Sequence, residues 1–175
     1  MPATTPARAP AKVSAPDEAL IAKRPLLGQA QKDACTRGES LGKLTIGMSP
    51  EALIAAYGEP SKKDKRMLYE ATGEHHETWN WQGKGVKVDM LAPAATGPVG
   101  QASFLMVSGP FGGKTAKGVG IGSTREDVLR AYDACLDRES ISEQGITLGD
   151  VFNVALSFDF EGASVSSMSM GAMSE

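Results

Sequence analysis

The chain has 175 residues, of which 41% are hydrophobic and 22% charged, and its formal net charge is −3. These values are ordinary for a globular protein, no apolar run approaches the roughly 18–20 residues of a membrane span, and the charge balance argues against nucleic-acid binding. The length suits one domain or two small units that share a core.

Residues 1–16 read MPATTPARAPAKVSAP and contain five alanines and four prolines. Such a segment cannot bury enough apolar surface to offset its ordering entropy, so we expect a disordered Pro/Ala tether. It lacks the apolar stretch of a signal peptide, but it is compatible with what remains after a signal peptide has been removed. Tethers of this composition are common in envelope proteins.

A helical segment is predicted next, over residues 17–40, in two pieces separated near Pro25. Asp17 is suited to cap the first piece because its carboxylate can accept hydrogen bonds from the free N–H groups of the first turn. Gly38 is suited to end the second piece because glycine readily adopts the left-handed conformation found after helices.

The phrase IGMSPEALIAAY at residues 46–57 returns 75 residues later as IGSTREDVLRAY at residues 121–132. Self-similarity at a fixed spacing indicates a repeated structural unit. Both copies predict a helix start: Ser49 and Thr124 are good N-caps, and the acidic side chains after them suit the positive end of the helix dipole. In each copy the apolar residues fall on one helical face, which we expect to be buried.

Alternating polar and apolar residues, which are typical of half-buried antiparallel strands, follow each helix. The first group of predicted strands comprises residues 78–81, 86–91 and 101–108. The second group comprises residues 146–150, 153–160 and 163–170. Each unit is therefore expected to contain one helix followed by three antiparallel strands.

These elements predict an α+β fold made of two tandem helix-plus-antiparallel-strands repeats. We place repeat 1 at residues 41–108, a Gly-rich linker at residues 109–120 and repeat 2 at residues 121–175. One helix on three strands makes a thin core, so we expect the units to join their sheets or to stack. The helices would lie on one face of the sheet, and the other face would be open.

The two cysteines, Cys35 and Cys135, allow two interpretations. In a secreted chain an even number of cysteines indicates a disulfide, which here would close a loop of 100 residues and stabilise the fold by up to about 4.7 kcal/mol in the chain-entropy model. In a cytosolic protein they would be two buried thiols. The N-terminal tether favours the disulfide.

Two short motifs were candidates for chemistry. SGPFGGKT at residues 108–115 ends like a phosphate-binding loop, but serine stands where the first glycine is required, and the glycines that follow do not favour the helix that would hold a phosphate. We interpret it as a loop between the repeats. His75 and His76 lack the spacing of a zinc site and would point to opposite faces of a strand, so we predict no metal and no cofactor.

The sequence also predicts no catalytic residues, and a protein that is not an enzyme. No nucleophile elbow of the form G-x-S-x-G occurs. A small hydrolase that uses His75 or His76 is the lesser alternative. The basic cluster at residues 62–66, KKDKR, is interpreted as a solvated loop, with a partner-facing patch as the alternative.

The stretch IGMSPEALIAAYGEP, followed by WNW and a strand hairpin, resembles the small outer-membrane assembly lipoproteins (SmpA/OmlA-like) over residues 44–91. A weaker match over residues 118–135 has Asp133 and Ala134 in place of the Gly-x-Pro ending. Two such units resemble the tandem-repeat fold of the β-lactamase-inhibitory proteins over roughly residues 41–171, although those proteins carry more cysteines than the two present here. The resemblance implies a non-enzymatic envelope protein that works by presenting a sheet face.

An open antiparallel face with loops favours protein binding. The leading hypothesis is a periplasmic or outer-membrane-anchored protein of the inhibitor or immunity type, which occludes a partner enzyme or toxin. Anchoring through a lipidated N-terminus is compatible with it, and the alternative is a structural outer-membrane assembly lipoprotein. Aromatic residues usually anchor interfaces. The residues expected to bind the partner are Tyr69, His75, His76, Asn80, Lys87, Asp89 and Phe111.

Overall fold

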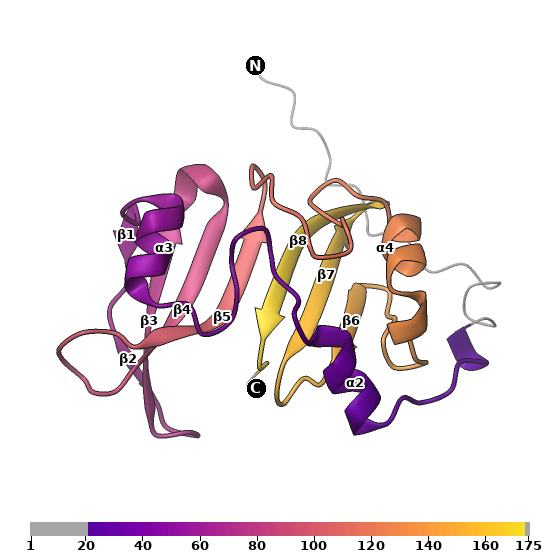
Figure 1. Cartoon of the computed structure of the whole chain (residues 1–175), viewed down its shortest axis with the longest axis horizontal. Helices are drawn as coiled ribbons and strands as arrows, with labels where there is room; N and C mark the ends of the chain where they lie inside the picture. The colour runs from indigo at the N-terminus through magenta and orange to yellow at the C-terminus, as the bar shows by residue number, and fades with distance from the viewer. Residues whose placement is uncertain (1–20, 174–175) are drawn as a thin grey trace, which may run out of the picture.

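In the computed structural model, residues 21–173 are described, and they form an α+β fold (Figure 1). The described helices are α2 (Gln29–Thr36), α3 (Pro50–Tyr57) and α4 (Arg125–Ala131), with the 3₁₀ turns η1 (Gln82–Lys84) and η2 (Asp133–Cys135). The strands are β1 (Lys62–Lys63), β2 (Met67–Tyr69), β3 (Glu74–Trp81), β4 (Val86–Ala92), β5 (Gln101–Ser108), β6 (Gly145–Gly149), β7 (Ala155–Glu161) and β8 (Ser164–Gly171). The tether predicted at residues 1–16 and the Asp17 cap lie outside the described residues.

All eight strands belong to one antiparallel sheet, in the order β1-β3-β4-β5-β8-β7-β6, with β2 also paired to β3. The strands β3, β4 and β5 of the first half (residues 41–108) form one meander, and β6, β7 and β8 of the second half (residues 121–173) form another. The meanders join where β5 pairs with β8. The last strands of the two halves therefore lie side by side in the middle of the sheet (Figure 1).

The starts of α3 and α4 confirm the predicted caps. The Ser49 hydroxyl accepts a hydrogen bond from the Ala52 N–H, and Pro50 occupies the first turn. The Thr124 hydroxyl accepts from the Asp127 N–H, while the Asp127 carboxylate accepts from the Thr124 N–H. Such caps satisfy backbone donors that have no partner inside the helix. The chain therefore enters both helices at positions that its local sequence specifies.

A pair of backbone hydrogen bonds fixes the approach to each of these helices. The Gly47 N–H donates to the Ala102 carbonyl of β5, and the Ala102 N–H donates back to the carbonyl of Met48. In the second half the Gly122 N–H donates to the carbonyl of Val165 in β8, and the Val165 N–H donates back to that of Ser123. Gly47 and Gly122 have φ values of 86° and 88°, which residues with a Cβ rarely adopt. Each phrase is thus attached to the last strand of its own half.

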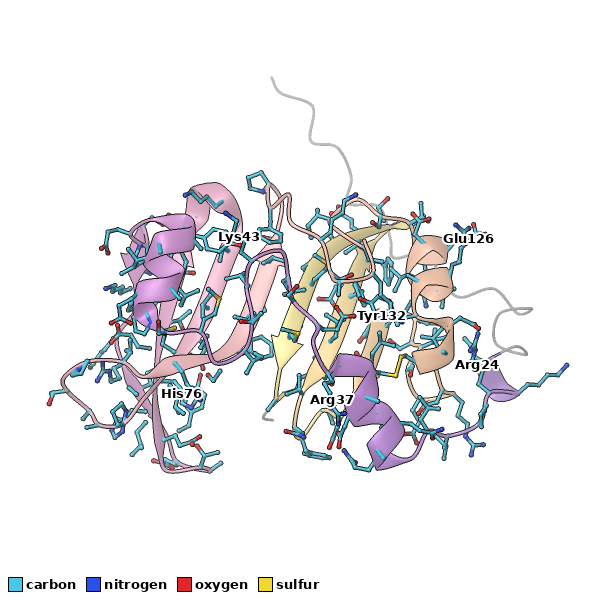
Figure 2. The ribbon with its side chains drawn as sticks, viewed as in Figure 1. Arg24, Arg37, Lys43, His76, Glu126 and Tyr132 are labelled. Carbon is cyan, nitrogen blue, oxygen red and sulfur yellow. A yellow bond between two sulfur atoms is a disulfide. The ribbon has the colours of Figure 1, made fainter. Side chains whose placement is uncertain are left out.

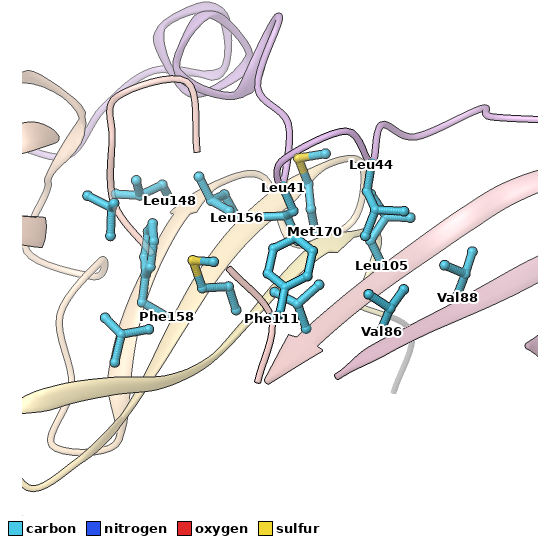
Figure 3. Packing of buried hydrophobic residues seen from close by; sticks show 14 of the residues in the cluster. Leu41, Leu44, Val86, Val88, Leu105, Phe111, Leu148, Leu156, Phe158 and Met170 are labelled. Atoms are coloured by element: carbon cyan, nitrogen blue, oxygen red, sulfur yellow. The ribbon is translucent and has the colours of Figure 1, made fainter. Parts of the chain in front are cut away.

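One hydrophobic core runs under both halves (Figure 3). Leu53 of α3 and Val128 of α4 are both fully buried, and they belong to the same cluster as alternate residues of the strands. Removing this apolar surface from water is the main stabilising contribution to the fold. The strand residues in the cluster include Trp79, Trp81, Val86, Val88, Met90, Leu105, Val107, Ile146, Leu148, Leu156, Phe158, Met168 and Met170.

The segment at residues 109–120 does more than connect the halves. Phe111 is 8% exposed and Val119 is 3% exposed, and both belong to the core cluster. Gly42 and Gly113 pack against the Phe111 ring, which leaves no room there for a Cβ on Gly113. The sequence predicted a glycine-rich loop at these residues. Gly113 of this loop and Gly42 also form the surface against which the Phe111 ring packs.

Candidate functional site

Five of the seven residues predicted to bind a partner lie close together on the side of the sheet away from the core. On β3 the predicted alternation holds, so His76 and Asn80 share one face while His75 lies on the other. Lys87 of β4 is directly opposite Asn80, and Asp89 is opposite Thr78. Tyr69 of β2 stacks on His76. We call Tyr69, His76, Asn80, Lys87 and Asp89 the polar cluster.

The centre of the polar cluster is a stack of two rings held by a carboxylate. The Tyr69 and His76 ring centroids are 4.1 Å apart, with an angle of 14° between the rings. The Nδ1 of His76 lies 2.5 Å from Asp89 Oδ2, and its Nε2 lies 3.8 Å from a Glu74 carboxylate oxygen. The His76 and Asp89 side chains are only 11% and 16% exposed. Asp89 therefore fixes the imidazole of His76, which in turn supports the Tyr69 ring. Figure 2 labels His76 among the side chains of the first half.

Asp89 also accepts hydrogen bonds from neighbouring strands. The hydroxyl of Ser103 lies 3.2 Å from Asp89 Oδ2, and that of Thr78 lies 3.5 Å from Oδ1. Ser103 thus contacts the carboxylate and not the imidazole, whereas a nucleophilic serine needs hydrogen bonding to its histidine base. These contacts of Asp89 hold His76 in place beside Tyr69.

Burial raises the pKa of Tyr69, and the negative charge of Asp89 raises it further. The Tyr69 hydroxyl therefore stays protonated at neutral pH and can donate a hydrogen bond. Tyr69 is 38% exposed, and one face of its ring is covered by His76. A partly exposed tyrosine with a fixed ring is typical of protein interfaces.

A second group of polar contacts surrounds Asn80. Its amide nitrogen donates to Asp64 Oδ2 at 3.1 Å, and Lys62 Nζ lies 2.7 Å from Asp64 Oδ1. The hydrogen bond from Lys62 lowers the pKa of Asp64. Asn80 is 8% exposed, so it orders this edge of the sheet more than it contacts solvent. Lys87, directly across from it, is exposed.

The two remaining candidates lie elsewhere. His75 points to the opposite face of β3, between Leu68 and Ala92 on the neighbouring strands, and is half-buried. Phe111 is 8% exposed and belongs to the hydrophobic core cluster, near Leu41 and Leu105 (Figure 3). Its ring packs between Gly42 and Gly113, which favours a role in the core, and its contact with a partner stays a prediction.

Sequence reasoning missed several exposed apolar side chains. Met67 and Leu68 of β2 are 62% and 51% exposed, and Met106 of β5, opposite Lys87, is 39% exposed. The inward positions of Leu105 and Val107 could have placed Met106 on the outer face. Phe152, at 87% exposure, lies in the turn between β6 and β7, and no pattern in the sequence distinguished it.

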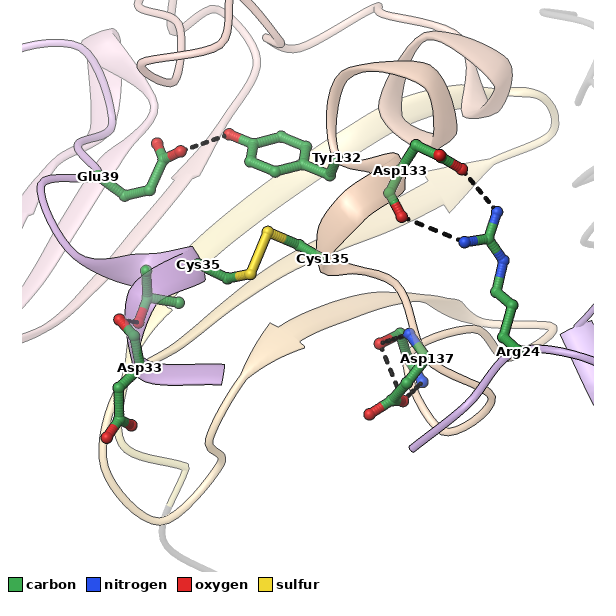
Figure 4. Close-up of a disulfide and its surroundings, with 10 residues drawn as sticks. Arg24, Asp33, Cys35, Glu39, Tyr132, Asp133, Cys135 and Asp137 are labelled. Atoms are coloured by element: carbon green, nitrogen blue, oxygen red, sulfur yellow. Dashed lines mark hydrogen bonds and ion pairs between the residues drawn. A yellow bond between two sulfur atoms is a disulfide. The ribbon is translucent and has the colours of Figure 1, made fainter. Parts of the chain in front are cut away.

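The predicted disulfide between Cys35 and Cys135 is present and attaches α2 to η2 in the second half (Figure 4). Close to it, Asp137 is 2% exposed and accepts hydrogen bonds from the N–H groups of Leu27 and Glu139. Arg24 pairs with Asp133 at 2.7 Å. These contacts attach the segment before the first half to the far end of the sheet.

The described surface includes a cavity near α3 and another near the disulfide. One, of about 420 Å³, lies between the end of α3 and the glycine-rich loop and is lined by Lys43, Tyr57, Lys84 and Phe111 among others. The other, of about 510 Å³, lies beside the disulfide. Across residues 21–173, no group of three or more His, Cys, Asp or Glu side chains is arranged to hold a metal ion.

Comparisons with protein-family models, with curated proteins and with solved structures give no match for this chain. Among the helices described, none has the length and apolar character needed to cross a membrane. The geometry of the polar cluster is therefore the basis on which a function can be assigned.

Proposed function

We propose that the chain is a protein-binding module of the inhibitor or immunity type, which occludes a partner enzyme or toxin with the polar cluster and the loops around it. The observation that carries this proposal is the fixed Tyr69–His76–Asp89 arrangement on the outer face of the first half, bordered by exposed Met67 and Met106. An aromatic anchor within a polar and apolar surface is the usual composition of a protein interface.

The rigidity of the cluster supports this role. Association loses less free energy to ordering when the contacting side chains are already held in one conformation. Tyr69 is held by its stack on His76, and His76 is held by Asp89, which also accepts from Ser103. The exposed ammonium group of Lys87 adds a charge that can orient a partner before contact.

The proposed architecture is a tandem repeat whose helices share one face of the sheet. The two halves use matching N-caps, matching left-handed glycines, and the same reciprocal backbone bonds to their last strands, at Ala102 and at Val165. Leu53 and Val128 occupy corresponding places in the repeated phrase and enter one core. In this arrangement the helices cover the core side, and the polar cluster is left on the other side.

The proposed compartment is the bacterial periplasm, with or without an outer-membrane anchor. Disulfides persist in oxidising compartments and are rare in the cytosol. The Cys35–Cys135 bridge supports this location.

The test begins with recovery of the partner. The tagged full chain is used to capture proteins from the envelope fraction of the source organism, and mass spectrometry identifies them. The affinity of the isolated partner is then measured calorimetrically for the wild type and for Lys87→Glu and Asp89→Lys. We expect each variant to weaken binding by about tenfold or more. Lys87→Glu reverses an exposed charge that faces the partner, and Asp89→Lys removes the carboxylate that fixes His76 and, through it, Tyr69.

Matched charge reversals on α4 provide the control. Arg130→Glu and Glu126→Lys change side chains that are 71% and 83% exposed and far from the polar cluster in sequence. They should leave the affinity unchanged, and circular dichroism should show that all four variants are folded. Barrel-assembly proteins as the captured partners would favour the structural lipoprotein instead. Equal affinities for the Lys87 and Asp89 variants and the wild type would contradict the proposal.

A further inference from the structure

The sheet has an outer edge next to the polar cluster. Residues 62–69, comprising β1, the intervening residues 64–66 and β2, run along one side of β3, and the described strands continue no further in that direction. We call residues 62–69 the outer edge. Backbone N–H and C=O groups on the free side of an edge strand can pair with a strand from another chain.

The outer edge is apolar at one end. Met67, Leu68 and Tyr69 are 62%, 51% and 38% exposed, so three consecutive large apolar side chains face solvent. The strand is nevertheless well fixed, since Tyr69 stacks on His76 and its carbonyl accepts the Gly73 N–H in the following turn. Proteins usually protect edge strands of this kind with charges, prolines or a covering loop. Here the apolar end is left uncovered by residues 21–173.

The other end of the outer edge is basic. Lys62, Lys63 and Lys65 are exposed, and Asp64 is the one acidic residue among residues 62–66. Lys62 pairs with Asp64, whereas Lys63 lies over the Trp79 ring at 4.0 Å from its centroid. Within the described part of the chain, Lys63 and Lys65 have no carboxylate partner. The charge of Arg66 is offset by Glu77, which lies 3.0 Å away.

We propose that the outer edge accepts an extended acidic segment of the partner as an added β-strand. Backbone hydrogen bonds would supply much of the affinity, as in other cases of strand addition. Carboxylates of the added segment would lie near Lys63 and Lys65, and its apolar side chains would contact Met67, Leu68 and Tyr69. This inference rests on the proposed function and specifies the chemistry of the partner.

Two synthetic peptides test the inference directly with the full chain. One alternates glutamate with valine over eight residues, and the other has lysine in place of each glutamate. Fluorescence anisotropy should show the glutamate peptide binding about fivefold or more tightly than the lysine peptide, because glutamates would pair with Lys63 and Lys65 whereas lysines would be repelled by them. Amide hydrogen exchange measured by NMR should slow at alternate residues of the outer edge when the glutamate peptide binds.

Variants separate this edge from the polar cluster. Lys63→Glu/Lys65→Glu should abolish the preference for the glutamate peptide, while the matched pair Lys23→Glu/Lys43→Glu, on exposed lysines elsewhere, should retain it. An absence of slowed amide exchange at residues 62–69 would overturn strand addition. Edge-to-edge dimers of the chain, seen by sedimentation and lost in Leu68→Asp, would also overturn it, because the edge would then bind a second copy.

The captured partner distinguishes failure of this inference from failure of the proposed function. If Lys87→Glu weakens that complex but Lys63→Glu/Lys65→Glu does not, the partner binds the sheet face and the edge inference is wrong. If neither variant weakens it, the proposed function itself fails. If both weaken it and the edge amides are protected in the complex, both are supported.

Discussion

The two halves use the same phrase, yet its final tyrosine has a different environment in each. Tyr132 is fully buried, and its hydroxyl donates to a Glu39 carboxylate oxygen at 3.0 Å. Burial raises the pKa of Tyr132 far above its usual value, and the charge of Glu39 adds to this. Tyr57 is only half-buried and lies beside one of the cavities. The same tyrosine position in the repeated segment thus makes a buried polar contact in one half and is part of the surface in the other.

The outer sheet face differs between the halves in the same way. Over β3 and β4 it carries the polar cluster, with large and charged side chains. Over β6, β7 and β8 the corresponding positions are mostly glycine, alanine, serine and threonine, with the charged Asp159 on β7, and Thr147 and Ser157 hydrogen-bond to each other at 3.0 Å. The second half also holds the disulfide. This difference supports the proposal that the first half carries the partner contacts, and we expect the second half to contribute more of the stability.

The largest expected effect comes from the disulfide. Cys35→Ser/Cys135→Ser opens a loop of 100 residues, and the chain-entropy model gives a loss of up to about 4.7 kcal/mol in the free energy of unfolding. Urea unfolding measures the loss. Because α2 packs on β6, hydrogen exchange should accelerate more in β6 than in β3. A loss of less than about 1 kcal/mol in the free energy of unfolding would contradict the prediction that the disulfide stabilises the fold. Equally faster hydrogen exchange in β6 and β3 would show that the disulfide does not stabilise the second half more than the first.

The tyrosine pair should show the next largest effect. Tyr132→Phe leaves a buried carboxylate oxygen of Glu39 without its donor, and we expect a loss of about 1.5–3 kcal/mol. Tyr57→Phe changes a half-buried side chain and should cost less than about 0.5 kcal/mol. Urea unfolding of the two variants side by side provides the measurement. Similar losses would show that the two tyrosines have equivalent roles after all.

The helix caps should instead show how alike the halves are. Ser49→Ala and Thr124→Ala each remove a side-chain acceptor at a helix start, at a cost of about 1 kcal/mol. Thr124→Ala should cost slightly less, because alanine keeps the backbone N–H that donates the reciprocal hydrogen bond to the Asp127 carboxylate. Thermal unfolding of both variants measures the difference. A negligible effect in one half alone would weaken the proposal that the halves are copies of one unit.

The smallest effect concerns acid stability. Burial alone raises the pKa of Asp137, but hydrogen bonds from Leu27, Glu139 and Ser140 lower it by more, so the net pKa lies below its usual value. The resulting stability is present above the unfolded-state pKa of about 4 and is lost as the pH falls through the folded-state pKa. In Asp137→Asn, the free energy of unfolding should therefore decrease less as the pH is lowered from about 5. If the variant and the wild type showed the same pH dependence of the free energy of unfolding, the acid sensitivity would come from other carboxyl groups.

Much of the local structure was predictable. The strand β5 has the predicted bounds, the caps at Ser49 and Thr124 are confirmed, and His75 and His76 point to opposite faces as alternation requires. The short strands β1 and β2 were missed because two or three residues carry too little periodicity. The difference in burial between Tyr57 and Tyr132 could not be predicted, because the burial of each side chain depends on residues distant in the sequence.

The sequence by itself determined where α3 and α4 begin, which side chains of the longer strands alternate, and that one twelve-residue pattern occurs twice. These features depend on backbone dihedral angles and on contacts a few residues apart. The tertiary structure decided that β5 joins β8, that Phe111 enters the core between Gly42 and Gly113, and that Asp89 orients His76. Burial and hydrogen bonding at these positions depend on segments brought together only when the sheet forms.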